Sequence, residues 1–369
     1  MTALPARSIF DGTGLPTTSA MKTAMGQLRD YLNEILGSTG GAPTAITSIN
    51  GGPLAGSRLK NGNKLVAQRG TSATVTAGTA VPTASTGYYT TDMFYAYCTG
   101  ANVTLAQVAG SDATHKRDQF TGAASVTAIG HGYRLDAAES AHMAGQTCTY
   151  SVELANSLLT SVTWTAYYAS TADAFGTIGT PTKTQIATGT FTVNSTVTKY
   201  SIQIALPAGA TTGVEIVLTV GAQISGTWTI GREDFRPGSV SPTYFEVPDS
   251  AQELIRCQRY CEKSYGDGVA PGSASQGGAF RGVAFSGADF YNSSGINFKV
   301  NKRAPVAFSF WSPATGNPNL FRDETAVGDI GVPAVLTNST TGATLYNSSS
   351  LLTAGRMYSV QWLAQCQIP

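Results

Sequence analysis

The run SVTWTAYYAS, residues 161–170, places Val162, Trp164, Ala166 and Tyr168 at every second position, with threonine and tyrosine between them. Successive side chains of a β-strand point to opposite faces, so this period predicts a strand that buries one face. TGVEIVLTV (212–220), GTFTVNSTVTKYSIQIAL (189–206) and SGTWTIG (225–231) show similar patterns, and Gly, Pro, Ser and Asn separate the runs. Because no helical pattern lies between them, residues 63–247 are predicted to form an antiparallel β-sandwich rather than a parallel βαβ sheet.

The N-terminal segments differ in composition from this region. Residues 1–37 begin as an arm rich in turn residues and continue as TTSAMKTAMGQLRDYLNEILG (17–37), which predicts a short helix. Its apolar residues recur at intervals of three and four, as in a coiled-coil seam, at Met21, Ala24, Leu28, Tyr31 and Ile35. An amphipathic helix docked on its own chain or on a partner fits the same pattern. Residues 38–62 are rich in Gly, Pro, Ser and Thr, which predicts a flexible linker.

A second helix is predicted at residues 248–267, a range that overlaps DSAQELIRCQRYCEKSYGDG (249–268). Ser250 and Glu253 have the spacing of a capping box, and Leu254, Cys257 and Cys261 would share one helical stripe. Two thiols four residues apart could supply half of a zinc site, but no second ligand pair has the required spacing. We therefore interpret this helix as a structural connector, whose thiols pack against the adjacent domains or against other copies of the chain.

Residues 268–369 return to β character in GGAFRGVAFSG, GINFKVNKRAPVAFSFWSP, ATLYNSSS and GRMYSVQWLAQCQ. They predict a small C-terminal β-sandwich. The predicted fold class is therefore mainly β, with a short N-terminal helix, an antiparallel sandwich, a connecting helix and a second, smaller sandwich.

The charge balance bears on possible partners. With 23 Lys and Arg against 22 Asp and Glu, the net charge is +1, and charged residues make up 12% of the chain. Nucleic acids and anionic membranes attract basic surfaces, so neither is an expected partner. No apolar run approaches the ~18 residues of a membrane-spanning helix, and no apolar signal segment follows the first residues. Five cysteines cannot all pair, which predicts free thiols in a reducing cytosol.

Motifs for catalysis are not evident. The sequence lacks a phosphate-binding loop, a dinucleotide fingerprint, an H-E-x-x-H zinc motif and a G-x-S-x-G elbow. We therefore expect no metal, no cofactor and no enzymatic activity.

Aromatic residues on β-strands remain as candidates for ligand contact, because flat ring faces grip sugars and anchor interfaces. The segment GYYTTDMFYAY (87–97) fits either core packing or a contact surface. In the C-terminal domain, the candidate ligand-binding residues are Trp311, Phe321, Arg322 and Asp323.

Two passages resemble bacteriophage tail fibre proteins. LPARSIFDGTGLPTTSAMKTAMGQLRDYLNEILG (4–37) is similar to the virion-attaching ends of some tail fibres. GREDFRPGSVSPTYFEVPDSAQELIRCQRYCEKSY (231–265) resembles a strand–turn–helix signature whose core reads E-L-x-x-C-Q-R-Y-Y-x-K-S-Y, with Cys261 where an aromatic residue is usual. Upstream, residues 63–231 look like the jelly-roll, carbohydrate-module-like domain that usually precedes this signature, and Tyr89 and Asp92 match its Y-x-x-D.

The resemblance implies an elongated homotrimer in the virion tail, synthesised in the host bacterial cytoplasm. Residues 1–37 would attach to adaptor or baseplate proteins of the tail, and the tip, residues 268–369, would contact polysaccharide or lipopolysaccharide of the host. The predicted trimer interface consists of Met21, Leu28, Tyr31, Ile35, Leu254, Cys257, Arg259 and Cys261. Two alternatives stay open: a connector fibre that docks another receptor-binding protein, and a polysaccharide depolymerase.

Overall fold

The computed structural model describes residues 22–23, 25–28, 48–49, 52–53, 56–242, 245, 247, 249–291 and 295–369. The chain divides into two units, Met1–Gly56 and Ser57–Pro369. In the first unit, residues 22–23 and 25–28 are helical, and β1 (Ser48–Ile49) pairs with β2 (Gly52–Pro53). Leu28 belongs to the helical residues, whereas Met21, Tyr31 and Ile35 lie outside the described part of the chain.

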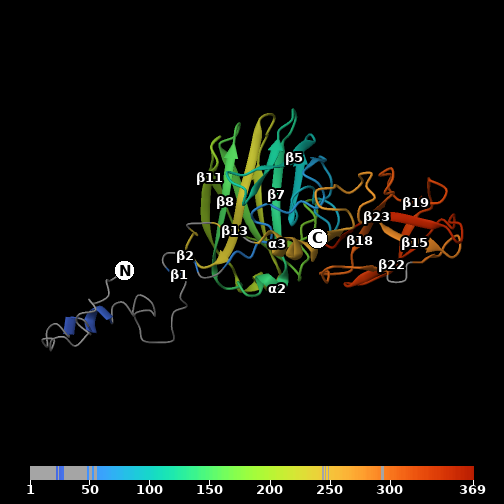
Figure 1. Ribbon diagram of the computed structural model, residues 1–369. Coiled ribbons are helices and arrows are strands. Elements are labelled where there is room, and N and C mark those ends of the chain that lie inside the picture. The colour runs from blue at the N-terminus through green and yellow to red at the C-terminus, as the bar shows by residue number, and fades with distance from the viewer. Residues whose placement is uncertain are drawn as a thin grey trace. The chain divides into compact units, whose positions relative to one another are not determined.

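The N-terminal part of the second unit contains two antiparallel sheets that face each other (Figure 1). The five-stranded sheet has the order β10–β9–β12–β7–β4, formed by Lys183–Thr192, Ser161–Ala169, Val214–Val220, Ala128–Leu135 and Phe94–Thr99. The six-stranded sheet has the order β11–β8–β13–β6–β5–β3, formed by Thr198–Ala205, Thr147–Asn156, Thr227–Pro237, Lys116–Thr121, Val103–Ala109 and Ser72–Val75. Helix α2 (Ala137–Ser140) and the 3₁₀-helix η2 (Ala208–Thr212) connect strands of the sandwich.

Alternation along the strands builds the core between these sheets. On β9, Val162, Trp164 and Ala166 are buried in the core, as their two-residue spacing predicts. Ile216 and Leu218 of β12 join them. Each fully buried aliphatic side chain contributes about 1.5–3 kcal/mol, so two such faces provide ample reason for the sheets to stack. The expectation of a mainly β chain with antiparallel sheets is confirmed.

The C-terminal region contains two more sheets around a second core. Strand β23 (Met357–Gln365) is central in a seven-stranded sheet that also contains β14 (Cys261–Lys263), β15 (Phe280–Ala284), β16 (Phe290–Tyr291), β18 (Ala307–Trp311), β19 (Phe321–Asp323) and β20 (Gly328–Ile330). A three-stranded sheet consists of β17 (Ile296–Asn297), β22 (Gly342–Asn347) and β21 (Pro333–Asn338). Leu345 of the small sheet and Trp362 of the large one both belong to this core.

Helix α3 (Ser250–Gln258) is shorter than the predicted range 248–267. Its N-cap is Asp249, whose carboxylate accepts the Ala251 and Gln252 N–H groups, so the predicted capping box at Ser250 is wrong. Glu253 instead accepts the backbone N–H of Asn61 at 2.8 Å.

Cys261 also departs from the predicted helix. It begins strand β14, which pairs with β23, so it does not share a helical stripe with Leu254 and Cys257. Backbone pairing with a distant strand overrides the local helical pattern here.

Residues 57–62 pack into the sandwich, although the sequence predicts a flexible linker over 38–62. Leu59 is buried in the core, and Asn61 Nδ2 donates to the Val66 and Asp92 carbonyls. Lys60 Nζ lies 3.3 Å from Glu139. A single leucine and hydrogen bonds to distant residues leave no periodic signal in a Gly-rich segment, which is why composition misses this anchoring.

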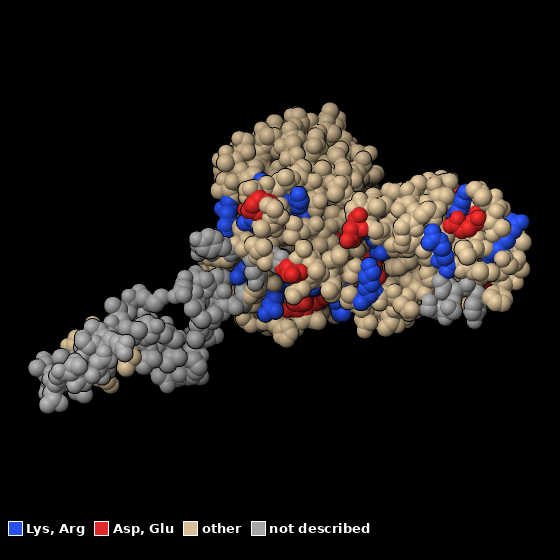
Figure 2. All heavy atoms as spheres, viewed as in Figure 1, with Lys and Arg blue, Asp and Glu red and all other residues tan. Residues whose placement is uncertain are grey.

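Charged residues are sparse and mixed in sign on the surface. On the face drawn in Figure 2, Lys and Arg side chains lie beside Asp and Glu rather than in a patch of one sign. Within the described residues, no helix is both long enough and apolar enough to cross a bilayer.

All five cysteines, at positions 98, 148, 257, 261 and 366, are free and buried. Burial raises the pKa of Cys148 and of Cys261 to about 12, and that of Cys257 well above its usual range. Because the thiolate is the reactive form, we expect a maleimide to label none of these thiols in the native protein at neutral pH. All five should react after unfolding in guanidinium chloride, as counted by mass spectrometry. Rapid labelling of a native thiol would contradict this prediction.

Candidate functional site

The outer face of the five-stranded sheet contains a hollow of about 300 Å³. Three tyrosines line it together with threonine, aliphatic, proline and lysine side chains: Tyr95, Tyr97, Thr165, Tyr167, Ile178, Pro181, Lys183, Val217 and Thr219. We call it the tyrosine hollow. Strand alternation explains its aromatic wall, because Phe94 and Ala96 of β4 are buried in the core whereas Tyr95 and Tyr97 point to the other face.

Two glycines of β7 make room for these rings. Tyr95 lies opposite Gly132, and Tyr97 lies opposite Gly130 in the β4–β7 ladder. A Cβ atom on Gly132 would lie 2.3 Å from the Tyr95 ring, and one on Gly130 would lie 2.0 Å from the Tyr97 ring. The rings therefore lie directly over the glycine backbone and form the floor of the hollow at this end.

A fully buried carboxylate lies beside the hollow. Glu215 Oε1 accepts hydrogen bonds from Arg134 Nε at 2.6 Å and from Tyr95 OH at 2.9 Å, and Lys183 Nζ donates to Oε2. Glu215 is opposite Arg134 on one side and Tyr167 on the other in the sheet register. A buried carboxylate needs such partners, because losing its hydration costs several kcal/mol.

The tyrosines of the hollow are neutral at physiological pH. Burial raises the pKa of Tyr97 to about 12, with the Glu215 charge adding to the effect, and it raises the pKa of Tyr95 well above its usual range. Burial also lowers the pKa of Lys183, although Glu215 opposes that shift. The Tyr95 hydroxyl already donates to Glu215, so the hollow offers a ligand ring faces and the Tyr97 hydroxyl, which can donate or accept a hydrogen bond.

Ile368, which follows β23, accepts hydrogen bonds from residues beside Glu215 and the hollow. Arg134 donates to the Gly176 carbonyl at 2.8 Å and to the Ile368 carbonyl at 3.4 Å. Tyr88 OH also donates to the Ile368 carbonyl, at 2.9 Å. Because Ile368 is buried in the sandwich core, the arginine that pairs with Glu215 is held by a segment from the far end of the chain.

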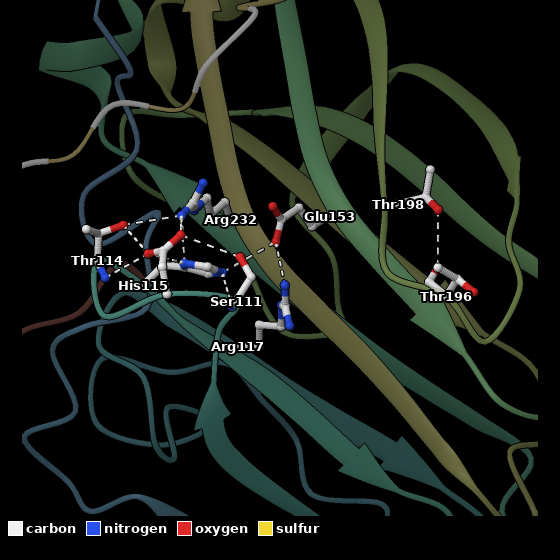
Figure 3. A network of polar contacts seen from close by, with 9 residues as sticks. Ser111, Thr114, His115, Arg117, Glu153, Thr196, Thr198 and Arg232 are labelled. Carbon is white, nitrogen blue, oxygen red and sulfur yellow. Dashed lines mark hydrogen bonds and ion pairs between the residues drawn. The ribbon is translucent and has the colours of Figure 1, made fainter.

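A second polar cluster lies at the six-stranded sheet (Figure 3). His115 Nδ1 is 3.1 Å from Asp112 Oδ1, and the Ser111 N–H donates to His115 Nε2 at 3.2 Å. Arg232 donates to Asp112 Oδ2 at 2.7 Å. A histidine beside a carboxylate is a common catalytic pair, but the His115 ring is fully buried and contacts its own loop. We interpret this cluster as the anchor of the 110–115 loop.

The four predicted ligand residues of the C-terminal domain do not share one surface. Phe321 is fully buried in the second core. Asp323 is 2% exposed, and its carboxylate accepts the N–H groups of Thr325 and Ala326. Phe321 and Asp323 lie on the same face of β19, and that face packs toward the interior of the domain.

Trp311 and Arg322 do lie on a common face, opposite Gln361 and Ser359 of β23. Trp311 is half-buried against Tyr265, with ring centroids 6.1 Å apart. Arg322 is 3.4 Å from Asp329. Both side chains thus have partners within the chain.

The predicted interface residues of the connecting segment are placed within the second unit. Cys257 and Cys261 are fully buried inside one chain, so these thiols pack against the adjacent domains rather than against another copy. Leu254 packs against the sandwich core, and Arg259 is exposed. Trimer formation stays a prediction.

Sequence reasoning singled out the segment 87–97 but not Arg134, Lys183 or Glu215. A usable signal was present in GHGYR (130–134), where two glycines occupy one face of a strand. The partners of those glycines become evident once the ladder register is known.

Comparisons with known proteins give partial structural similarities. No family model and no curated protein matches the chain. The enzymatically active domain of tailspike protein 4 from bacteriophage CBA120 is similar at 17% identity and a TM-score of 0.29, over 43% of this chain and 21% of that one. The chain therefore spans about a fifth of the tailspike structure.

Carbohydrate-binding modules are also among the similar structures. A CBM4 module has a TM-score of 0.31 at 11% identity, over 48% of this chain and 98% of the module. The C-terminal family 22 module of Clostridium thermocellum Xyn10B has a TM-score of 0.28 at 18% identity, over 43% of this chain and 99% of the module. With TM-scores below 0.5, these similarities assign neither a family nor a function.

Proposed function

We propose that this chain is a bacteriophage tail fibre protein that binds host-surface glycan through the tyrosine hollow. The observation that carries the proposal is the hollow itself, where three tyrosines, threonine hydroxyls and a lysine meet on the outer face of a sheet. Ring faces pack on the apolar faces of sugars, and surrounding polar groups orient the sugar hydroxyls. The lining extends from β4 to β10, four strand spacings of ~4.8 Å, which suits a chain of several sugars.

In this proposal the protein is a homotrimer of the virion tail. The resemblance of residues 4–37 and 231–265 to tail fibre proteins supports this setting. Residues 1–37 attach to adaptor or baseplate proteins, and the second unit contacts polysaccharide or lipopolysaccharide of the bacterium. Three weak sites on one fibre can raise overall attachment by ~10²–10⁴ without any new contact.

We propose binding rather than hydrolysis as the role of the hollow. Glycoside hydrolysis generally uses two carboxyl groups that flank the scissile bond. The described lining of the hollow contains no carboxylate, and both oxygens of the buried Glu215 are engaged by Tyr95, Arg134 and Lys183. Release of reducing ends from host polysaccharide would favour the depolymerase alternative instead.

Replacing Tyr97 with alanine should weaken glycan binding at least about tenfold, because the change removes a ring that lines the hollow. Titration calorimetry with polysaccharide extracted from the host measures the effect, and attachment to intact host cells checks it. Tyr346→Ala in β22 is the matched control and should bind normally.

Unchanged affinity of a folded Tyr97→Ala protein would refute the hollow as the glycan site. If the wild-type protein binds neither host cells nor their extracted glycans, the connector-fibre alternative gains support.

A further inference from the structure

We infer that the tyrosine hollow is selective for acidic saccharides, whose anionic group binds beside Lys183. This inference rests on the proposed glycan-binding function and specifies the class of glycan. It is carried by the charges and the geometry around Lys183.

The positive and negative charges around Lys183 do not balance. Of the described residues that line it, Lys183 alone is charged. Its partner Glu215 is shared with Arg134, so two cations face one carboxylate. An excess of one positive charge follows.

Neighbouring ion pairs do not cancel this excess. Arg69 and Arg303, whose charges also act on nearby Tyr88, are 3.0 Å from Asp92 and from Asp173 respectively. Each of these arginines has its own carboxylate, so the positive excess stays with the group formed by Arg134, Lys183 and Glu215.

Lys183 is held where a ligand can reach it. Its ammonium donates to Glu215 and lies 4.3 Å from the centroid of the Tyr167 ring, and its side chain is 12% exposed. An ammonium has three N–H donors, so the contact with Glu215 leaves donors for a ligand anion. Because the ammonium covers the Tyr167 ring, we place the stacked sugar nearer Tyr97.

The environment strengthens the attraction between Lys183 and an anion. Opposite charges near a protein surface interact about four times more strongly than in bulk water. A carboxylate or other anionic substituent would also accept a hydrogen bond from the neutral hydroxyl of Tyr97, which lines the hollow. A neutral sugar would use the ring faces but leave the excess charge without a partner.

The experiment compares acidic glycans with uncharged forms of themselves. Bacterial surface polysaccharides that contain hexuronic acids are each tested beside their carboxyl-reduced derivatives, by titration calorimetry with the full chain. We expect the acidic form to bind about tenfold more tightly, and this preference to shrink as salt is added. Lys183→Met should abolish the preference, whereas Lys183→Arg should retain it.

The controls separate this inference from the proposed function. Lys116→Met, in β6 of the opposite sheet, should keep the preference, and thermal melting verifies that each variant is folded. Equal or tighter binding of the reduced forms would overturn the acidic selectivity and leave glycan binding intact, as would a preference that survives in Lys183→Met. If no member of any pair binds, both the inference and the proposed function fail.

Discussion

Replacing Lys64 with methionine should lower the free energy of unfolding by about 3–5 kcal/mol. The Lys64 ammonium is fully buried between the two sheets, 2.6 Å from Glu233 Oε1 and 3.5 Å from Asp118 Oδ2. It also lies 2.8 Å from the centroid of the Phe94 ring. Methionine preserves most of the apolar stem but leaves two buried carboxylates without their cation, and an uncompensated buried charge is among the costliest changes in a core.

The pH dependence of this effect follows from Asp118. Burial raises the pKa of Asp118, but Lys64 and His131 outweigh burial and hold that pKa below the usual value of 3.8. A depressed pKa stabilises the folded state above pH ~4, and the contribution is lost as pH falls through the folded-state pKa. Without Lys64, burial should raise the pKa of Asp118. As the pH falls, the folded variant would then be protonated at Asp118 before its unfolded state is. The difference in unfolding free energy between the variant and the wild type should therefore shrink in acid.

Guanidinium denaturation at pH 7 and at pH 4 measures both parts of this prediction. Lys116→Met in β6 provides the control, since a surface substitution should change stability by less than about 0.5 kcal/mol. If Lys64→Met unfolds at the wild-type midpoint at pH 7, the buried ion cluster does not stabilise the sandwich as argued.

Replacing Arg134 with methionine should have the second largest effect on stability, and it should also weaken glycan binding in the tyrosine hollow. The change leaves the fully buried Glu215 with Tyr95 and Lys183 as partners, and it removes the hydrogen bond to the Ile368 carbonyl. We expect a loss of about 1.5–3 kcal/mol in unfolding free energy, because the buried carboxylate loses a charge-assisted hydrogen bond while Lys183 still pairs with it. Glycan affinity should fall as well, since Glu215 positions both Tyr95 and Lys183.

A double variant separates the stability of the ion pair from the function of the site. Arg134→Met combined with Glu215→Leu removes both of these residues, and replacing a buried pair with apolar residues is often nearly neutral. Lys183 then loses its carboxylate, but its side chain is 12% exposed and its ammonium can turn to water. We therefore expect the double variant to recover most of the stability but not the glycan affinity, as measured by denaturation and calorimetry. A double variant no more stable than Arg134→Met would show that the loss comes from packing rather than from the broken contact between Arg134 and Glu215.

Some features of this protein are encoded locally, and these the sequence predicts. The two-residue period of SVTWTAYYAS corresponds to β9, with Val162, Trp164 and Ala166 in the core. Residues 87–97 fitted either core packing or a contact surface, and the same alternation assigns neighbouring residues to each. Phe94 is buried in the core, while Tyr95 and Tyr97 line the hollow. A side chain's face depends on its own strand, so no distant residue is needed to predict it.

Local patterns were insufficient where a distant strand or residue competes. The helical pattern of 248–267 is interrupted because Cys261–Lys263 pairs with β23, about one hundred residues later in the chain. Residues 57–62 look like linker, yet Asn61 is held by Glu253 and by the carbonyls of Val66 and Asp92. None of these partners can be inferred from the composition of the segment itself.

The amino-acid sequence by itself determined the β architecture, the apolar faces of the strands and the aromatic character of residues 87–97. Only the tertiary structure decided that Glu215 meets Arg134, Tyr95 and Lys183, and that Gly130 and Gly132 lie beneath two tyrosine rings. The physical reason is register: these contacts join strands that are far apart in sequence, and a shift of one residue in any ladder would turn the side chains to the opposite face.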